Sequence, residues 1–129
     1  MYKKLSKKEI GKYGERIATK LLKNQGHTIL KHNHHSRYGE IDVVSHTPIY
    51  YPGPGQIHFT EVKTRFTDSI NHPLETITPK KRKRLLLTAI DFLEKNDIRN
   101  KSWRIVLIGI LLRRDFSIEK IYTHSIFDG

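Results

Sequence analysis

The chain contains no cysteine and no long hydrophobic segment. Without cysteine it can form no disulfide, offers no thiolate to a metal and has no thiol nucleophile. The longest apolar run, residues 105–112, is far shorter than the roughly 20 residues that a helix needs to cross a bilayer. The lysines near the N-terminus are followed by no apolar segment. These absences predict a cytoplasmic protein that is not inserted in a membrane.

Acidic residues are also scarce. The 129 residues include 24 lysines and arginines but only 13 aspartates and glutamates, which gives a formal net charge of +11 and a sequence pI of about 10.0. Such a surface attracts polyanions through counterion release, and nucleic acid is the commonest of them. Charge alone does not distinguish duplex DNA, RNA and an anionic membrane surface. The length fits one compact domain, residues 1–129.

The hydrophobic pattern predicts an α/β protein with the element order αβββαββ. A helix is expected over 7–25, with Ser6 as N-cap, Glu9 completing a capping box and Gly26 after its end. A second helix is expected to begin after Thr78 and Pro79. Residues 31–39 are expected to form a polar loop, and the proline-rich residues 47–55 the connection of a hairpin. Strands are expected at 27–30, 40–46, 56–65, 102–112 and 118–124.

Two of the predicted neighbouring strands carry residues that could form a metal site. Side chains two apart on a strand share a face, so Glu61 and Lys63 in the stretch FTEVKTR lie together. If the hairpin register places Asp42 on that face, two carboxylates converge beside the lysine. Such ligands suit Mg²⁺ or Mn²⁺, and the backbone carbonyl of Val62 offers a further oxygen. A metal there would stabilise charge on a phosphodiester under attack, with Lys63 orienting a water.

The first predicted helix offers a third acid. At about 100° per residue, Glu15 falls at the rim of the apolar face rather than opposite it. It is either a solvated glutamate or a carboxylate that reaches the sheet. Gly11 and Gly14 lie in the same helix, where each is unfavourable by roughly 1 kcal/mol relative to alanine. They indicate close approach of another backbone or of a ligand.

Basic residues gather at the start of the second predicted helix. Positive charge there opposes the helix dipole, so another interaction must favour it, and a phosphate backbone is the obvious one. Two arginines elsewhere would extend this surface. The expected nucleic-acid contacts are Lys80, Lys81, Arg82, Lys83, Arg84, Arg65 and Arg37.

Each of these features also has a plainer interpretation. An acid and a base on one strand face often form a surface ion pair that contributes little. The bases of the second helix could simply be solvated. The histidines in HNHH, residues 32–35, could bind zinc, although no cysteine and no finger spacing accompany them, and contact with phosphate is simpler. Tyr50 and Tyr51 could stack on a base or pack on the sheet.

Four segments, in this order from about residue 8 to residue 94, together resemble the motifs of one family: GKYGERIATKLLKNQGHTILKHN, YGEIDVV, FTEVKTR and TPKKRKRLLLTAIDFL. This family is the YraN-like family of predicted endonucleases, which are relatives of archaeal Holliday junction resolvases within the PD-(D/E)xK nuclease superfamily. The chain departs from the family in its longer, proline-rich hairpin connection, and in its late strand WRIVLIG, which lacks an acid.

The resemblance implies a restriction-endonuclease-like fold, with a three-layer core and a mixed central sheet with helices on it. It implies a metal site at Asp42, Glu61 and Lys63, with Glu15 as the helix acid of that site. Glu40 would be the acid of the GEID motif. Strict alternation along the strand instead points Glu40 away from Asp42, so a structural role in the turn after Gly39 is the alternative.

Three functions are compatible with these features. The first is a Mg²⁺- or Mn²⁺-dependent endonuclease that hydrolyses DNA, including branched or flapped DNA. The second is a catalytically inactive nucleic-acid-binding module on the same fold. The third is a structural protein that binds an acidic partner or a membrane surface. A junction resolvase would need a homodimer to cut two strands symmetrically, and the sequence pattern does not indicate a dimer interface.

Overall fold

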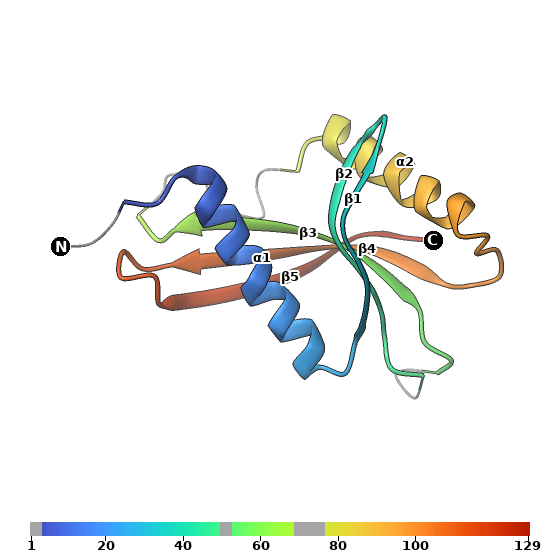
Figure 1. Ribbon diagram of the computed structural model, residues 1–129, viewed down its shortest axis with the longest axis horizontal. Coiled ribbons are helices and arrows are strands. Elements are labelled where there is room, and N and C mark those ends of the chain that lie inside the picture. The colour runs from blue at the N-terminus through green and yellow to red at the C-terminus, as the bar shows by residue number, and fades with distance from the viewer. Residues whose placement is uncertain (1–3, 50–52, 69–76) are drawn as a thin grey trace.

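The computed structural model describes residues 4–49, 53–68 and 77–129. In these parts two helices pack on one five-stranded sheet, and the predicted order αβββαββ is confirmed (Figure 1). Tyr50 and Tyr51 lie outside the described residues. The elements are α1 (Lys7–Asn24), β1 (Thr28–Ser36), β2 (Gly39–His46), β3 (Ile57–Phe66), α2 (Pro79–Lys95), β4 (Trp103–Leu112) and β5 (Ile118–Asp128).

The strands lie in the order β1-β2-β3-β4-β5. Neighbouring strands are antiparallel except β3 and β4, which run parallel from Ile57 beside Trp103 to Phe66 beside Leu112. Parallel neighbours need a crossover, and α2 lies in the connection that supplies it. The sheet is therefore mixed, as the sequence predicts. Neither described helix is long and apolar enough to cross a membrane.

The helix boundaries follow from local chemistry. Ser6 Oγ accepts a hydrogen bond from the N–H of Glu9, and Glu9 Oε1 accepts one from the N–H of Ser6, both at 3.1 Å. This reciprocal pair is the predicted capping box. At the start of α2, Thr78 Oγ1 accepts from the N–H of Lys81 at 3.1 Å, and Pro79 is the first helical residue. Gly26 follows α1 with a positive φ of 90°, which glycine adopts without strain.

Two apolar clusters lie on opposite faces of the sheet. Along β4, Leu107 packs in the cluster beneath α2, whereas Ile108 packs in the cluster beneath α1. β3 alternates in the same way, with Phe59 on the α2 side and Val62 on the α1 side. The sheet is thus the middle of three layers. Glu61 has the parity of Phe59, so it faces the α2 layer.

The expected loop at 31–39 is wrong for most of its length, because β1 continues to Ser36 and only Arg37 and Tyr38 form the turn. The strand reads as polar because it is an edge strand, and most of its side chains are exposed. His34 is the buried exception: its Nε2 lies 2.9 Å from Asp91 Oδ2 on α2. This contact ties the β1–β2 hairpin to α2 (Figure 1).

The two glycines of α1 differ. A Cβ at Gly14 would lie 1.8 Å from Thr64 Oγ1, so α1 can rest on β3 at this point only because residue 14 has no side chain. The predicted close approach occurs there, but with the side chain of Thr64 rather than with a backbone or a ligand. A Cβ at Gly11 would meet nothing within 4 Å, so no such approach occurs at that position.

Candidate active site at the divergence of two strands

The pairing of β2 with β3 stops where the predicted acids begin. The two strands pair from His46 beside Ile57 to Val43 beside Thr60, and no farther. Past this point the N–H of Val62 donates to Oδ2 of Asp42 at 2.7 Å. A side-chain carboxylate therefore takes the place of a strand partner, at a gap between β2 and β3.

A break in β1 accompanies this gap. In the β1–β2 register His32 lies beside Val43 and His34 beside Ile41, which leaves Asn33 opposite Asp42. Asn33 has a positive φ of 52°, so the ladder is interrupted at this position. The regular alternation predicted for β2 is wrong here, because Ile41 packs beneath α2 whereas Val43 packs beneath α1. The distortion turns Asp42 towards β3.

Asp42 and Glu61 form an acid pair at this gap. Glu61 is its more buried member, with 5% of its surface exposed. Burial raises its pKa to about 7, and the hydrogen bond and negative charge of Asp42 add to this rise. Its Oε2 lies 3.1 Å from Lys81 Nζ, as an ion pair. Apart from this ammonium, no described residue is placed against Oε2. This buried oxygen is available to a further cation.

Asp42 is also perturbed. Burial raises its pKa to about 6, the hydrogen bonds from Glu61 and from the N–H of Val62 oppose the rise, and the neighbouring Glu15 adds to it. Together with Glu61 it retains a proton at pH values where ordinary carboxylates are ionised. The helix acid Glu15 thus reaches the sheet, through Asp42 rather than through Glu61.

Lys63 lies two residues after Glu61, on the same face of β3 by strand alternation. It is partly buried, and no hydrogen bond or ion pair holds its ammonium within the described parts of the chain. The ammonium that does contact Glu61 comes from α2. Lys81, predicted as a contact for nucleic acid, is thus a member of the acid site.

Other predicted site residues lie elsewhere. Glu40 is 41% exposed at its side chain and faces His35 across the hairpin, with Oε1 3.7 Å from Nε2. Arg37, in the hairpin turn, donates to Tyr38 Oη at 2.6 Å and stacks on that ring. Arg65 donates to the carbonyl of Thr64 at 3.0 Å. None of these contacts brings the three residues to the pair of Asp42 and Glu61.

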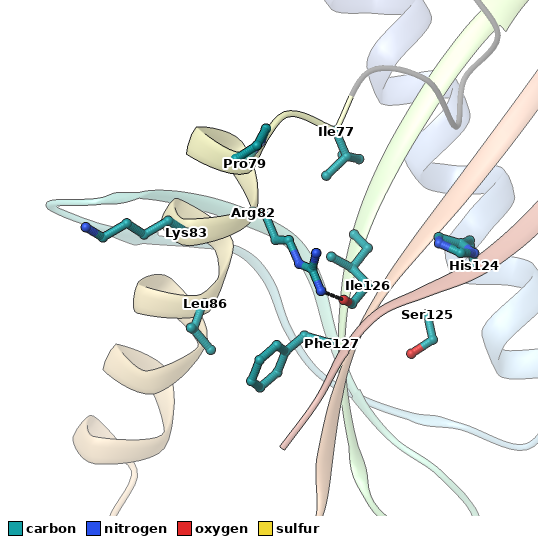
Figure 2. Close-up of a pocket in the computed structure, with 9 residues that line it drawn as sticks. All are labelled: Ile77, Pro79, Arg82, Lys83, Leu86, His124, Ser125, Ile126 and Phe127. Atoms are coloured by element: carbon teal, nitrogen blue, oxygen red, sulfur yellow. Dashed lines mark hydrogen bonds between the residues drawn. The ribbon is translucent and has the colours of Figure 1, made fainter.

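The bases of α2 divide into two groups. Lys81 points to Glu61, and Arg82 donates to the carbonyl of Ile126 on β5 at 3.0 Å, across a pocket of about 580 Å³ (Figure 2). Lys83 also lines this pocket, and Figure 2 shows its ammonium pointing away from Arg82. Lys80, Lys83 and Arg84 are exposed. Of the five predicted contacts in KKRKR, two are therefore engaged within the protein.

The donor set fits a hard divalent cation. Asp42 and Glu61 offer carboxylate oxygens, and the carbonyl of Val62 leaves β3 on the same side as its N–H, towards the gap. Within the described residues no three histidine or acidic side chains are grouped around one point, as a metal held wholly by side chains would need. Mg²⁺ is commonly held by one or two carboxylates, with water and phosphate oxygens completing its shell. The pair suits this second arrangement.

The contact of Lys81 with Glu61 and the positive φ of Asn33 were not expected from the sequence. No local pattern indicates the contact of Lys81, because it depends on how α2 docks on the sheet. The signal for Asn33 was its residue type, since asparagine tolerates a positive φ better than most residues do.

Comparisons with known proteins agree on one family. The profile of the uncharacterised protein family UPF0102 matches residues 14–110, which include all of the site described above. A UPF0102 protein of Sulfurihydrogenibium sp. (strain YO3AOP1) is 32% identical over 119 residues, which cover 92% of this chain and 98% of the relative. UPF0102 proteins of Clostridium novyi and Bifidobacterium longum are 38% and 36% identical, over 88% and 84% of this chain and 92% and 86% of theirs. The chain therefore belongs to the uncharacterised protein family UPF0102.

Proposed function

We propose that this protein is a metal-dependent DNA endonuclease that hydrolyses phosphodiester bonds. The observation that carries the proposal is the pair of Asp42 and Glu61 at the gap between β2 and β3, where both carboxylates have raised pKa values and Asp42 is fixed by the N–H of Val62. Perturbed acids that converge beside lysines are typical of catalytic sites rather than of surface ion pairs. The resemblance to YraN-like predicted endonucleases supports the same function.

Mg²⁺ or Mn²⁺ would be held by Asp42, Glu61 and the carbonyl of Val62. When bound, such a metal supplies charge stabilisation to a phosphodiester and lowers the pKa of a coordinated water. The burial of Glu61 and the proton retained by the acid pair support this assignment, because both indicate that the ammonium of Lys81 alone does not neutralise the two carboxylates. A divalent ion would displace that proton.

Two lysines would act on the substrate side of the site. Lys63 shares a face with Glu61 and would orient the attacking water or take a proton from it. Lys81 lies 3.1 Å from Glu61 and is 34% exposed at its side chain, so its ammonium can also reach a phosphate oxygen. Glu15 would position Asp42 through their contact. Glu40 is not needed for these roles.

The net charge of +11 supports a polyanionic substrate, and the resemblance to junction resolvases favours branched or flapped DNA. Symmetric cutting of a four-way junction would require two copies of the chain. Each copy has two edge strands, β1 and β5, which are the places where a sheet can be extended.

Cleavage assays test the proposal directly. Labelled duplex, flap, four-way-junction and single-stranded DNA are incubated with the protein in Mg²⁺, in Mn²⁺ and in EDTA. We expect product only with metal, and a loss of at least a hundredfold in the isosteric variant Glu61→Gln and in Glu61→Ala. Glu94→Gln, an exposed acid on α2, is the matched control and should cleave at the parental rate.

Two outcomes would contradict the proposal. Equal cleavage by the parent and Glu61→Gln would show that the acid pair is not the site. Binding of DNA without product under every metal condition would instead support the inactive nucleic-acid-binding module. In that case the late strand β4, which carries no acid, is the first place to restore one.

A further inference from the structure

A groove runs between α1 and β1 that the predicted contacts for nucleic acid did not include. Its volume is about 490 Å³. Four basic residues of α1 line it at positions 12, 16, 20 and 23, a spacing that puts them on one side of the helix. From position 12 to position 23 the helix rises by roughly 16 Å. The groove is lined by Lys12, Glu15, Arg16, Thr19, Lys20, Lys23, His32 and Asn33.

The positive charge of this groove is largely uncompensated, since Glu15 is the single acid among the described residues that line it. Lys12, Arg16, Lys20 and Lys23 are exposed, and none of them forms an ion pair with a described residue. Like charges four apart on a helix repel each other, so the stripe destabilises α1 slightly in the absence of an anion. The α2 surface differs, because Lys81 and Arg82 already have partners in the protein.

Two lining residues connect the groove to the acid pair of Asp42 and Glu61. Glu15 lines it, and the same carboxylate acts on Asp42. Asn33 also lines it, at the break in β1 that lies opposite Asp42. A chain of phosphates that follows the basic stripe along α1 would therefore arrive at the gap between β2 and β3. Figure 1 shows α1 lying across the sheet, with β1 starting beside its C-terminal end.

The lining indicates which part of a nucleic acid would lie there. No phenylalanine, tyrosine or tryptophan is among the lining residues, and His32 is the single aromatic ring, so the groove offers few surfaces on which bases could stack. Lysine and arginine at regular intervals suit phosphate oxygens, which carry no sequence information. Binding in the groove should therefore be insensitive to sequence and strongly dependent on salt.

We propose that the α1–β1 groove binds the phosphate backbone of one substrate strand and leads it to Asp42 and Glu61. This inference rests on the proposed nuclease function, because it identifies the track of that substrate. Lys12, Arg16, Lys20 and Lys23 contact successive phosphates, and Glu15 marks the point where the track meets the site. The exposed bases of α2 then contribute less to binding than the groove does.

Binding in EDTA tests the groove apart from cleavage. The double variant Lys20→Gln/Lys23→Gln is compared with Lys80→Gln/Lys83→Gln on α2 and with Lys101→Gln/Lys120→Gln, a charge-matched control at two positions that do not line the groove. We expect the groove variant to lose at least tenfold in affinity for single-stranded and flap DNA at low salt, equally for unrelated sequences. A plot of the logarithm of its affinity against the logarithm of the salt concentration should be less steep, by roughly 1.4 to 1.8 for two lost phosphate contacts.

The absence of cysteine allows a second, positional test. A photocrosslinker attached to Lys20→Cys should capture the labelled strand, whereas one attached to Lys120→Cys should not. Thermal unfolding of each variant checks its fold, and the exposed positions make large losses of stability unexpected.

The outcomes separate the two proposals. In one outcome the parent cleaves DNA, the groove variant binds as tightly as the control and the Lys20→Cys probe captures nothing. This result would contradict the proposed binding track and leave the proposed nuclease function intact. Groove-dependent binding without cleavage under any metal would overturn the nuclease and leave the groove as a binding track. A parent that binds no nucleic acid would overturn both.

Discussion

The ammonium of Lys81, in the first turn of α2, lies 3.1 Å from Oε2 of Glu61 in the middle of β3. This contact connects a helix that the sequence marks as basic to a buried acid on the sheet. It lowers the pKa of Glu61, against the larger effects of burial and of Asp42, which raise it to about 7. The ammonium of Lys81 therefore compensates part of the negative charge of Asp42 and Glu61, which a divalent cation would otherwise compensate alone.

Replacing Lys81 by glutamine should raise the pKa of Glu61 further. Carboxyl ¹³C NMR of the metal-free protein measures this titration without reference to activity. If the variant cleaves DNA, the acidic limb of its pH–rate profile should move to higher pH in the same direction. Lys83→Gln, two residues along the helix and exposed, should leave the titration of Glu61 unchanged. An unchanged titration in Lys81→Gln would contradict the ion pair.

The raised pKa of Glu61 also predicts a pH-dependent stability. A carboxyl that binds its proton more tightly in the folded chain stabilises the fold at low pH, and this stabilisation is lost as pH rises from about 4.5 to 7. In EDTA, Glu61→Gln should therefore match the parent near pH 4 and exceed it at pH 8. The difference should be on the order of 3 kcal/mol, or roughly 10–15 °C in Tm.

The comparison must be between variants, because other groups titrate in the same window. Burial lowers the pKa of His58 to about 4, so the stability it contributes is lost as pH falls from about 6.5 to 4, the opposite direction. Subtracting the curve of Glu61→Gln from that of the parent removes this effect. A difference that stays constant from pH 4 to pH 8 would show that Glu61 is not perturbed.

Much of the fold could be predicted from local patterns. The caps at Ser6 and Thr78 determine where both helices begin. The alternation of β3 correctly places Glu61 on the same face as Phe59 and on the face opposite Val62. These features depend on neighbours a few residues away. The polar strand β1 was missed because an edge strand buries few side chains, so that its pattern has no apolar period to detect.

The site was predictable in composition but not in geometry. Spacing indicates that Asp42 and Glu61 lie on neighbouring strands, yet it assumes regular strands. The break at Asn33 and the end of pairing at Val43 turn Asp42 towards Val62, and such irregularities arise from tertiary packing. The role of Lys81 likewise depends on how α2 docks on the sheet, which no local pattern contains.

The hydrogen bond from Val62 to Asp42 predicts different effects for two substitutions at one position. Asp42→Asn keeps an oxygen that can accept from the Val62 N–H, whereas Asp42→Ala leaves this buried donor unpaired. Both should abolish metal-dependent cleavage. The alanine variant should be less stable than the asparagine variant by about 1–3 kcal/mol in urea unfolding, and amide exchange at Val62 should be faster. Equal stability would mean that the bond does not hold β2 to β3.

The contact between Gly14 and Thr64 yields a prediction with an internal control. Alanine is favoured over glycine inside a helix by up to about 1 kcal/mol, and Gly11 has open space around it, so Gly11→Ala should stabilise the protein by roughly that amount. Gly14→Ala gains the same propensity but places a methyl group against Thr64 Oγ1. Such overpacking costs about 1–3 kcal/mol, so the net effect should be destabilising.

A second substitution tests whether contact with Thr64 causes the loss of stability in Gly14→Ala. Thr64→Ala removes the hydroxyl that the new methyl group meets first, so the double variant Gly14→Ala/Thr64→Ala should recover part of the stability lost in Gly14→Ala. Denaturant unfolding of the four proteins gives the coupling energy between the two positions. Because α1 carries Glu15 next to Gly14, a forced shift of the helix should also weaken cleavage. If Gly14→Ala is as stabilising as Gly11→Ala, α1 does not rest on β3 at this point.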